Sequence, residues 1–127
     1  MRPDVLPNAK KSTFRLAANE HEKVVVLVVN EGGDNNLHYH ANMDSVYFIM
    51  KGRVRFYGPE GDVFGEYGAD EGIIMPAGAR YRFEKVSTEE AQIFSVAIYP
   101  AGSAQASRVN VSPPKPEGSV TVIDTTH

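Results

Sequence analysis

Short apolar runs, rich in β-branched and aromatic residues, alternate along this chain with clusters of glycine, proline and acidic residues. Such runs between turn-forming clusters are typical of β-strands. No long stretch repeats its apolar positions with the 3.6-residue period of an amphipathic helix. Many short strands at regular spacing indicate a sandwich or a barrel, so the pattern predicts an all-β fold. The predicted strands are Ser12–Leu16, Lys23–Val29, Leu37–His40, Ser45–Met50, Arg53–Tyr57, Val63–Tyr67, Gly72–Met75, Tyr81–Lys85, Ala91–Tyr99 and Ser119–Ile123.

The chain has 127 residues, which is the length of a single domain. We expect an N-terminal extension with an edge strand over residues 1–22 and a barrel over residues 23–100. Residues 101–127 are expected to form a linker rich in proline and serine, followed by a C-terminal strand. A strand tethered in this way can pair with its own sheet or with the edge of a second copy, which is one route to a homodimer.

Composition and charge exclude several classes of protein. The formal net charge is −3 and the sequence pI is about 5.8, whereas general nucleic-acid binders carry a basic patch. The absence of cysteine excludes disulfides, thiolate zinc sites and a cysteine nucleophile. No apolar run approaches the roughly 20 residues that span a bilayer, and the N-terminus lacks the apolar core of a signal peptide. We therefore expect a soluble, cytoplasmic protein that binds neither nucleic acid nor membranes.

The candidate chemistry lies in residues 37–52, LHYHANMDSVYFIMKG. Residues two apart on a strand point to the same face, so His38 and His40 should project together while Tyr39 faces away. Histidine is a common ligand for zinc, copper, iron and nickel. Two partly exposed polar side chains would give the same spacing, so the pair alone leaves both interpretations open.

The wider spacing resembles the first motif of the cupin family. That motif is glycine, five residues, His-x-His, three or four residues, glutamate, six residues and glycine. Gly32, His38, His40 and Gly52 match it. Residues 76–78, Pro-Ala-Gly, match the Pro-x-Gly of the second cupin motif. The resemblance implies a single-domain jelly-roll barrel of two antiparallel sheets.

Two of the four ligand positions depart from the family pattern, because Ser45 stands where the motif has glutamate and Tyr81 where it has histidine. The nearest carboxylate is Asp44, which stands one residue before the glutamate position of the motif. It would face away from the cavity in a regular strand and could face inward from a loop. The resemblance implies His38 and His40 as metal ligands, with Asp44 or Tyr81 as a further ligand, for one divalent or ferric ion (zinc, iron, nickel or manganese). The alternative is a metal-free cavity in which the histidines act as hydrogen-bonding groups or general bases.

Alternation along the strands predicts the rest of the cavity wall. From Arg53–Tyr57, either the two arginines or the pair Val54 and Phe56 face inward. The last long strand offers Phe94, Val96 and Ile98 on one face. Arginines at the cavity mouth would suit a carboxylate or phosphate. The predicted substrate-binding residues are Tyr47, Arg55, Arg80, Arg82 and Phe83.

The residue types favour an enzyme over a binder. His38 or His40 could act as a base and Tyr81 as an acid on the other face of a substrate. An isomerase or epimerase of a small polar metabolite, such as a sugar derivative, needs such a pair. The alternatives are a non-catalytic ligand-binding or sensing module and a metal-dependent dioxygenase, and the two lost ligands count against a standard dioxygenase. No glycine-rich phosphate loop is found, so no nucleotide cofactor is expected. The resemblance also implies a homodimer.

Overall fold

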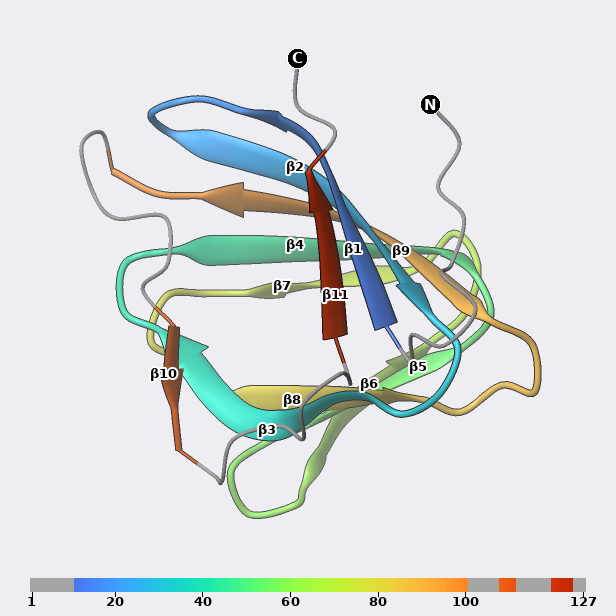
Figure 1. Cartoon of the computed structure of the whole chain (residues 1–127). Coiled ribbons are helices and arrows are strands. Elements are labelled where there is room, and N and C mark those ends of the chain that lie inside the picture. Colours follow the sequence, from blue (N-terminus) through green and yellow to red (C-terminus); the bar gives the residue numbers. More distant parts are fainter. Residues whose placement is uncertain (1–10, 101–107, 112–119, 125–127) are drawn as a thin grey trace.

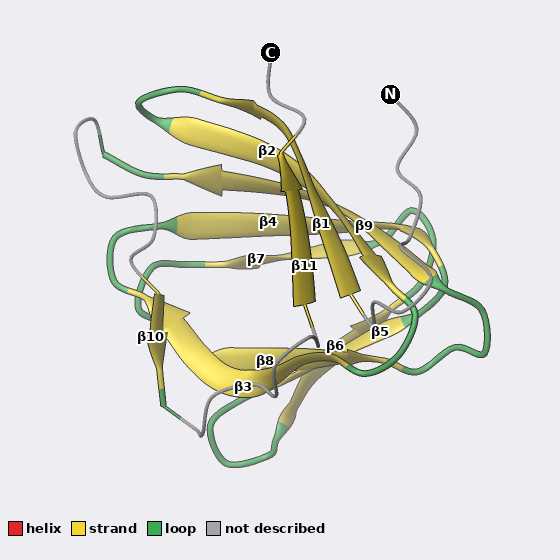
Figure 2. Ribbon diagram, viewed as in Figure 1, coloured by secondary structure: helices red, strands yellow, loops and turns green. Residues whose placement is uncertain are grey.

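A computed structural model describes residues 11–100, 108–111 and 120–124. These residues form strands and turns, with no helix among them (Figure 2). This described part accordingly holds no helix with the length and apolar character needed to cross a membrane. The strands are β1 (Lys11–Ala18), β2 (Glu22–Val29), β3 (Gly33–His40), β4 (Asp44–Lys51), β5 (Val54–Tyr57), β6 (Val63–Tyr67), β7 (Gly72–Met75), β8 (Tyr81–Lys85), β9 (Ala91–Ile98), β10 (Arg108–Asn110) and β11 (Val120–Asp124).

The strands form two sheets that face each other (Figure 1). The six-stranded sheet has the order β11-β1-β2-β9-β4-β7, and the five-stranded sheet has the order β10-β3-β8-β5-β6. All pairs are antiparallel except β1 and β11, which are parallel. The predicted all-β fold of two sheets is confirmed.

The hydrophobic core fills the space between the sheets. Each strand sends alternate side chains inward, and the largest of these are aromatic. The rings of Phe56 and Phe83 lie 5.3 Å apart between centroids, a distance at which tilted aromatic pairs attract. Fully burying one such side chain contributes roughly 1.5–3 kcal/mol, so this cluster holds the sheets together. Its members are Leu27, Val29, Tyr47, Ile49, Val54, Phe56, Met75, Tyr81, Phe83, Ala91 and Ile93.

The end of β4 needs a glycine, as the first cupin motif has it. Gly52 adopts a φ of +78°, which side chains other than glycine rarely tolerate. A Cβ there would stand 2.8 Å from the carbonyl oxygen of Glu90. The chain can therefore turn tightly from β4 into β5 and return to the opposite sheet.

The predicted C-terminal strand pairs with its own chain. β11 lies alongside β1, with Lys11 opposite Val120 and Arg15 opposite Asp124. On its other side β1 pairs with β2, so the N-terminal strand is flanked on both sides. The sequence missed β10, which lies within the predicted linker and pairs with β3. Three residues are too few to show a period of two.

The structure decides which residues of β5 and β9 face the core. Val54 and Phe56 are fully buried in it, which leaves Arg55 on the outer face. On β9, the inward side chains are Ala91, Ile93, Ser95 and Ala97. The sequence analysis named the other face of this strand, with Phe94, Val96 and Ile98, as a candidate for the cavity wall. Both faces of β9 are apolar, so alternation of polarity could not identify the inner one.

Candidate functional site

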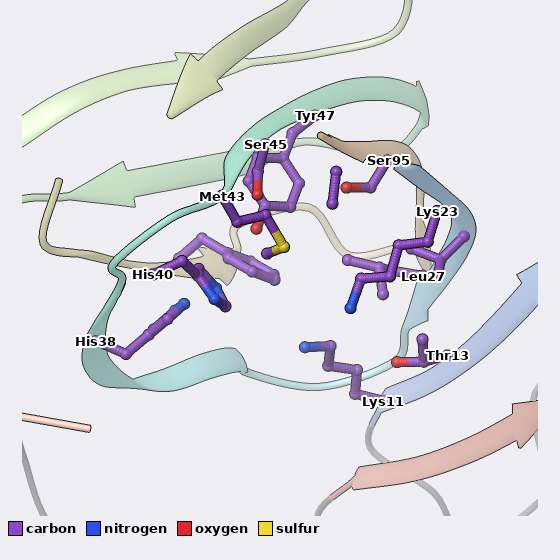
Figure 3. Close-up of a pocket in the computed structure, with 13 residues that line it drawn as sticks. Lys11, Thr13, Lys23, Leu27, His38, His40, Met43, Ser45, Tyr47 and Ser95 are labelled. Carbon is purple, nitrogen blue, oxygen red and sulfur yellow. The ribbon is translucent and has the colours of Figure 1, made fainter. Parts of the chain in front are cut away.

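A cavity of about 160 Å³ lies between the two sheets. This volume is below the roughly 300–1,000 Å³ of sites for drug-sized ligands, so it suits a small metabolite. Its wall combines an apolar surface with a few polar groups (Figure 3). The described residues that line it are Lys11, Thr13, Lys23, Val25, Leu27, His38, His40, Met43, Ser45, Tyr47, Phe83, Ser95 and Ala97.

His38 and His40 both line this cavity, as the two-residue spacing predicted. They stand on β3, and Tyr39 points to the other face, where its ring contacts Arg80. The imidazole centroids of the two histidines are 5.1 Å apart and the rings are nearly perpendicular. His38 is only 1% exposed. The pair therefore presents two neighbouring imidazoles to a ligand in the cavity.

Tyr81, which is not among the residues that line the cavity, lies in the core and contacts His38 there. Its ring centroid lies 4.4 Å from that of His38, and its side chain is 1% exposed. The phenol oxygens of Tyr81 and Tyr47 share a hydrogen bond. Tyr47 lines the cavity from β4, as does Phe83 from β8. Strands from both sheets thus bring two imidazoles and two phenols together, and a buried phenol pair of this kind can donate or relay a proton.

Ser45, and not Asp44, faces the cavity from β4. Ser45 is buried and lines the wall, whereas Asp44 is exposed. The Oδ1 atom of Asp44 accepts a hydrogen bond of 2.7 Å from the backbone N–H of Ala77. The next N–H, of Gly78, donates to the carbonyl oxygen of His40 at 2.8 Å. The Asp44 carboxylate therefore helps to fasten the 76–78 turn beside the histidine strand. The strand is already regular at Asp44, so this carboxylate is not among the residues that line the cavity with the two histidines.

The donor set fits a metal ion poorly. Among the described residues, no three His, Cys, Asp or Glu side chains converge on one point. A serine hydroxyl and a neutral phenol are weak donors to a divalent ion, and Ser45 and Tyr81 hold the two remaining ligand positions. The cavity wall also carries the ammonium groups of Lys11 and Lys23, whose charge repels a cation. We therefore derive no chemical step through a metal.

The predicted arginines lie outside the cavity. Arg55 forms an ion pair with Glu66, with 2.6 Å between Nη2 and Oε1. Arg53 also binds Glu66, and hydrogen bonds from Arg53 and Arg55 lower the pKa of that carboxyl. These side chains share the outer face of the five-stranded sheet. Local pairs between neighbouring strands account for both arginines, and Arg55 is not among the residues that line the cavity.

Arg80 and Arg82 also contact neighbouring side chains away from the cavity. The Arg82 guanidinium lies 4.0 Å from the ring centroid of Tyr57, and the Arg80 guanidinium lies 5.2 Å from that of Tyr39. Neither side chain lines the cavity described here. On β8, Tyr81 and Phe83 point inward, so their neighbours in the chain must point outward.

Two lysines were missed by sequence reasoning. Lys11 on β1 is 7% exposed, and Lys23 on β2 is half-buried. Burial, with a smaller effect of the nearby Arg15 charge, lowers the pKa of the Lys23 ammonium. A signal was present, because Lys23, Val25 and Leu27 alternate on one face of a strand. Because a lysine at the end of an apolar strand is ordinarily solvated, this alternation alone did not assign Lys23 to the interior.

No protein-family model and no curated protein sequence matches the chain. Solved structures do match it. The cupin domain of Schizosaccharomyces pombe Cnp3 aligns with a TM-score of 0.61 at 15% identity, covering 68% of this chain and 62% of that one. The polyketide cyclase RemF from Streptomyces resistomycificus gives 0.67 at 17% identity, covering 84% and 74%.

The nucleoside dehydratase Pac13 of Streptomyces aligns with a TM-score of 0.58 at 17% identity, covering 74% of this chain and 71% of that one. At such identities the likeness concerns the fold alone. The two facing sheets, the His-x-His strand at the cavity wall and these alignments agree with the expectation from sequence. The chain adopts the cupin fold, a jelly-roll barrel built around a small cavity.

Proposed function

We propose that this protein is an enzyme that performs acid–base chemistry on a small polar metabolite inside the cupin barrel. The observation that carries the proposal is the contact of His38 with Tyr81, which shares a hydrogen bond with Tyr47 beside a cavity. Two proton-transfer groups of different kinds thus stand at one small site. A small-molecule function also agrees with the enzymes among the aligned structures, a polyketide cyclase and a nucleoside dehydratase.

The two kinds of group suit opposite roles. An imidazole has an ordinary pKa near 6.5 and accepts a proton readily near neutral pH, while a phenol, with an ordinary pKa near 10, holds its proton and can donate it. In this proposal His40 or His38 removes a proton from the bound metabolite, and the Tyr47–Tyr81 pair supplies one. An isomerase or epimerase, for instance of a sugar derivative, requires this combination.

The test is a search for proton exchange. The purified protein is incubated in D2O with a library of small polar metabolites, and deuterium incorporation and product formation are followed by mass spectrometry. His40→Ala and Tyr81→Phe should each lower turnover of the substrate found by about 100-fold or more. Tyr57→Phe, which removes a phenol on the outer face, is the matched control and should leave turnover unchanged. Full turnover in both site variants would refute the proposal.

A non-catalytic ligand-binding or sensing protein is the second candidate, since the same cavity would hold a ligand without converting it. Metabolites that bind in the cavity and are recovered without chemical change would favour the ligand-binding function over the enzymatic one. A metal-dependent dioxygenase has the least support, because its usual ligand set includes a carboxylate beside two histidines. Asp44, the nearest candidate, is engaged with the 76–78 turn.

We also propose that the chain forms a homodimer through the outer face of the six-stranded sheet. Strands β4, β7 and β9 expose large apolar side chains on this face, with Ile74 65% exposed and Ile98 49% exposed. Val46 lies between Ile74 and Val96 in the register, which makes the surface continuous across three strands. Contiguous apolar surface of this kind on a soluble protein marks an interaction site. A second copy would cover it by twofold symmetry.

A further inference from the structure

Lys23 brings a primary amine into the cavity that holds the proton-transfer groups. Its side chain extends from β2 into the space between the sheets (Figure 3). Lys23 is half-buried, and burial lowers the pKa of its ammonium, with a smaller effect of the Arg15 charge. A lower pKa leaves more of the amine neutral near neutral pH, and the neutral amine is the nucleophilic form. The cavity therefore holds a nucleophile as well as acids and bases.

The register of the six-stranded sheet leaves room in front of this amine. Lys23 on β2 lies opposite Ala97 on β9, and Ala97 lies opposite Ser45 on β4. All three residues line the cavity. Two strand spacings separate the Cα atoms of Lys23 and Ser45 by roughly 10 Å. In this row of the wall only the methyl group of Ala97 stands between them, so a small ligand has space beside the amine.

The histidine pair faces this space from the other sheet. β3, which carries His38 and His40, belongs to the five-stranded sheet, whereas β2 belongs to the six-stranded sheet. In Figure 3 the two imidazoles and the Lys23 side chain enter the cavity from opposite sides. A ligand that lies between them would meet the amine on one side and an imidazole on the other.

We propose that Lys23 forms an imine with an aldehyde or ketone group of the metabolite that this cavity binds. The inference rests on the proposed function, because it names the substrate class of the same site. The lone pair of the Nζ atom attacks the carbonyl carbon, and the carbonyl oxygen takes up a proton while the nitrogen releases one. The resulting carbinolamine takes up a second proton and loses its oxygen as water, which leaves a protonated carbon–nitrogen double bond. These steps need no oxidant and no reductant.

The imine gives the amine and the imidazoles consecutive roles on one substrate. Its positive nitrogen withdraws electrons from the neighbouring carbon, so a C–H bond on that carbon becomes more acidic. His38 or His40 then accepts this proton and returns it to the other face or to an adjacent atom. Hydrolysis of the imine releases the product and restores the amine. An isomerase or epimerase that acts next to a carbonyl group uses these steps.

Lys11 is the other lysine of the cavity wall. Its Nζ atom lies 5.1 Å from the ring centroid of Phe83, and an aromatic face attracts an ammonium group. An ammonium group has no lone pair with which to attack a carbonyl carbon. We therefore assign the imine to Lys23, and the test has to distinguish the two lysines.

The test traps the imine by reduction. The full-length protein is incubated near neutral pH with sodium cyanoborohydride and either hydroxyacetone or propanal, a small ketone and a small aldehyde. The reagent reduces the imine to a stable secondary amine, which adds the mass of the carbonyl compound less one oxygen atom. Cleavage after glutamate separates Lys11 from Lys23, because Glu20 and Glu22 lie between them. Mass spectrometry of the peptides then assigns the label and its rate of formation.

We expect at least one of the two compounds to label Lys23 about tenfold or more faster than the exposed Lys51, because the cavity holds the carbonyl group against the amine. Lys23→Arg keeps the positive charge, removes the nucleophile and should abolish the fast labelling. Lys51→Arg makes the same exchange on a side chain paired with Glu90 and is the matched control, which should keep it. Circular dichroism verifies that each variant is folded. If both compounds label Lys51 or Lys11 of the wild type as fast as Lys23, the inference is overturned, and this comparison needs no variant.

The outcomes also separate this inference from the proposed function. If a library compound is converted in a manner that depends on Tyr81, while Lys23→Arg keeps full turnover and Lys23 shows no fast labelling, the imine is refuted and the enzyme stands. If Lys23 is labelled fast and no library compound is converted, the imine stands and the enzyme is refuted. If Lys23 shows no fast labelling and nothing is converted, both are refuted.

Discussion

The phenol oxygens of Tyr47 on β4 and Tyr81 on β8 share a hydrogen bond across the interior of the barrel, although the residues are 34 positions apart in the chain. β4 belongs to the six-stranded sheet and β8 to the five-stranded sheet. The bond therefore joins the two sheets next to the cavity, whose wall includes Tyr47. The ring centroid of Tyr81 also lies 4.4 Å from that of His38.

This bond predicts energetic coupling between the two tyrosines. Removal of one hydroxyl leaves its partner buried, so Tyr47→Phe and Tyr81→Phe should each lower the free energy of unfolding by about 1–3 kcal/mol. The double variant should lose less than the sum of the two, by roughly 0.5–1.5 kcal/mol, because the second change no longer breaks the bond between the two hydroxyls. Urea unfolding of the four proteins measures the cycle. Strictly additive losses would mean that the bond does not form in solution.

The residues at the four cupin ligand positions predict weak metal binding. Two substitutions at these positions should increase the affinity for a metal ion. The wild type, purified without an affinity tag and soaked with zinc, iron, nickel or manganese, should retain well below one metal per chain by elemental mass spectrometry. Ser45→Glu with Tyr81→His places the cupin family's missing ligands beside His38 and His40. This variant should retain close to one metal per chain. A wild type that holds one metal and loses it in His38→Ala would contradict our account of the donor set.

Lys23 is expected to lower stability at neutral pH. Its pKa is lowered in the folded protein, so between that value and the ordinary value of about 10.4 the unfolded chain binds more protons than the folded one. The free energy of unfolding should then rise with pH across this window. Lys23→Met should remove that rise and raise the free energy of unfolding at pH 7 by less than about 1 kcal/mol, because water screens the charge of a half-buried group. Urea unfolding between pH 7 and pH 10 provides the measurement, and a Lys23→Met protein that is less stable at pH 7 would show that the ammonium is well paired.

The exposed apolar face predicts the oligomeric state. Sedimentation velocity should show a dimer for the wild type, and Ile74→Lys should shift it to a monomer, because two lysines would meet at the twofold interface. Val63→Lys makes the same exchange on an exposed residue of β6 in the other sheet, and should leave the dimer intact. A wild type that sediments as a monomer at tens of micromolar, or a dimer that persists in Ile74→Lys, would argue against this surface.

The sequence predicted the parts of this site that depend on local spacing. His38 and His40 share a face because strand geometry alone requires it, and Phe83 follows from alternation after Gly78. Asp44 and Ser45 could not be separated, because a strand that begins one residue later would reverse the two side chains. The hydrogen bond from Ala77 to Asp44, which joins residues far apart in the chain, fixes the answer.

The placement of the lysines and arginines depends on contacts between strands, and only Lys23 has a signal in its own strand, the alternation with Val25 and Leu27. Arg55 faces outward because Glu66, on the neighbouring strand, pairs with it, and this contact depends on the register of β5 and β6. Lys11 and Lys23 enter the cavity because β1 and β2 pack beside β9 opposite the histidine strand. Neither relationship is local in the chain. An isolated lysine at the end of an apolar strand is ordinarily a solvated one.

In the proposed function, a small metabolite binds between the two sheets and contacts the histidine pair. The most direct measurement is NMR of the histidine imidazoles during titration with the tightest-binding compound of the metabolite library, with signals assigned by single His→Gln variants. We expect the signals of His38 and His40 to move together with binding, while that of His21, exposed between β1 and β2, stays in place. Saturable binding that leaves His38 and His40 unmoved would contradict it, because the ligand would then lie elsewhere on the protein.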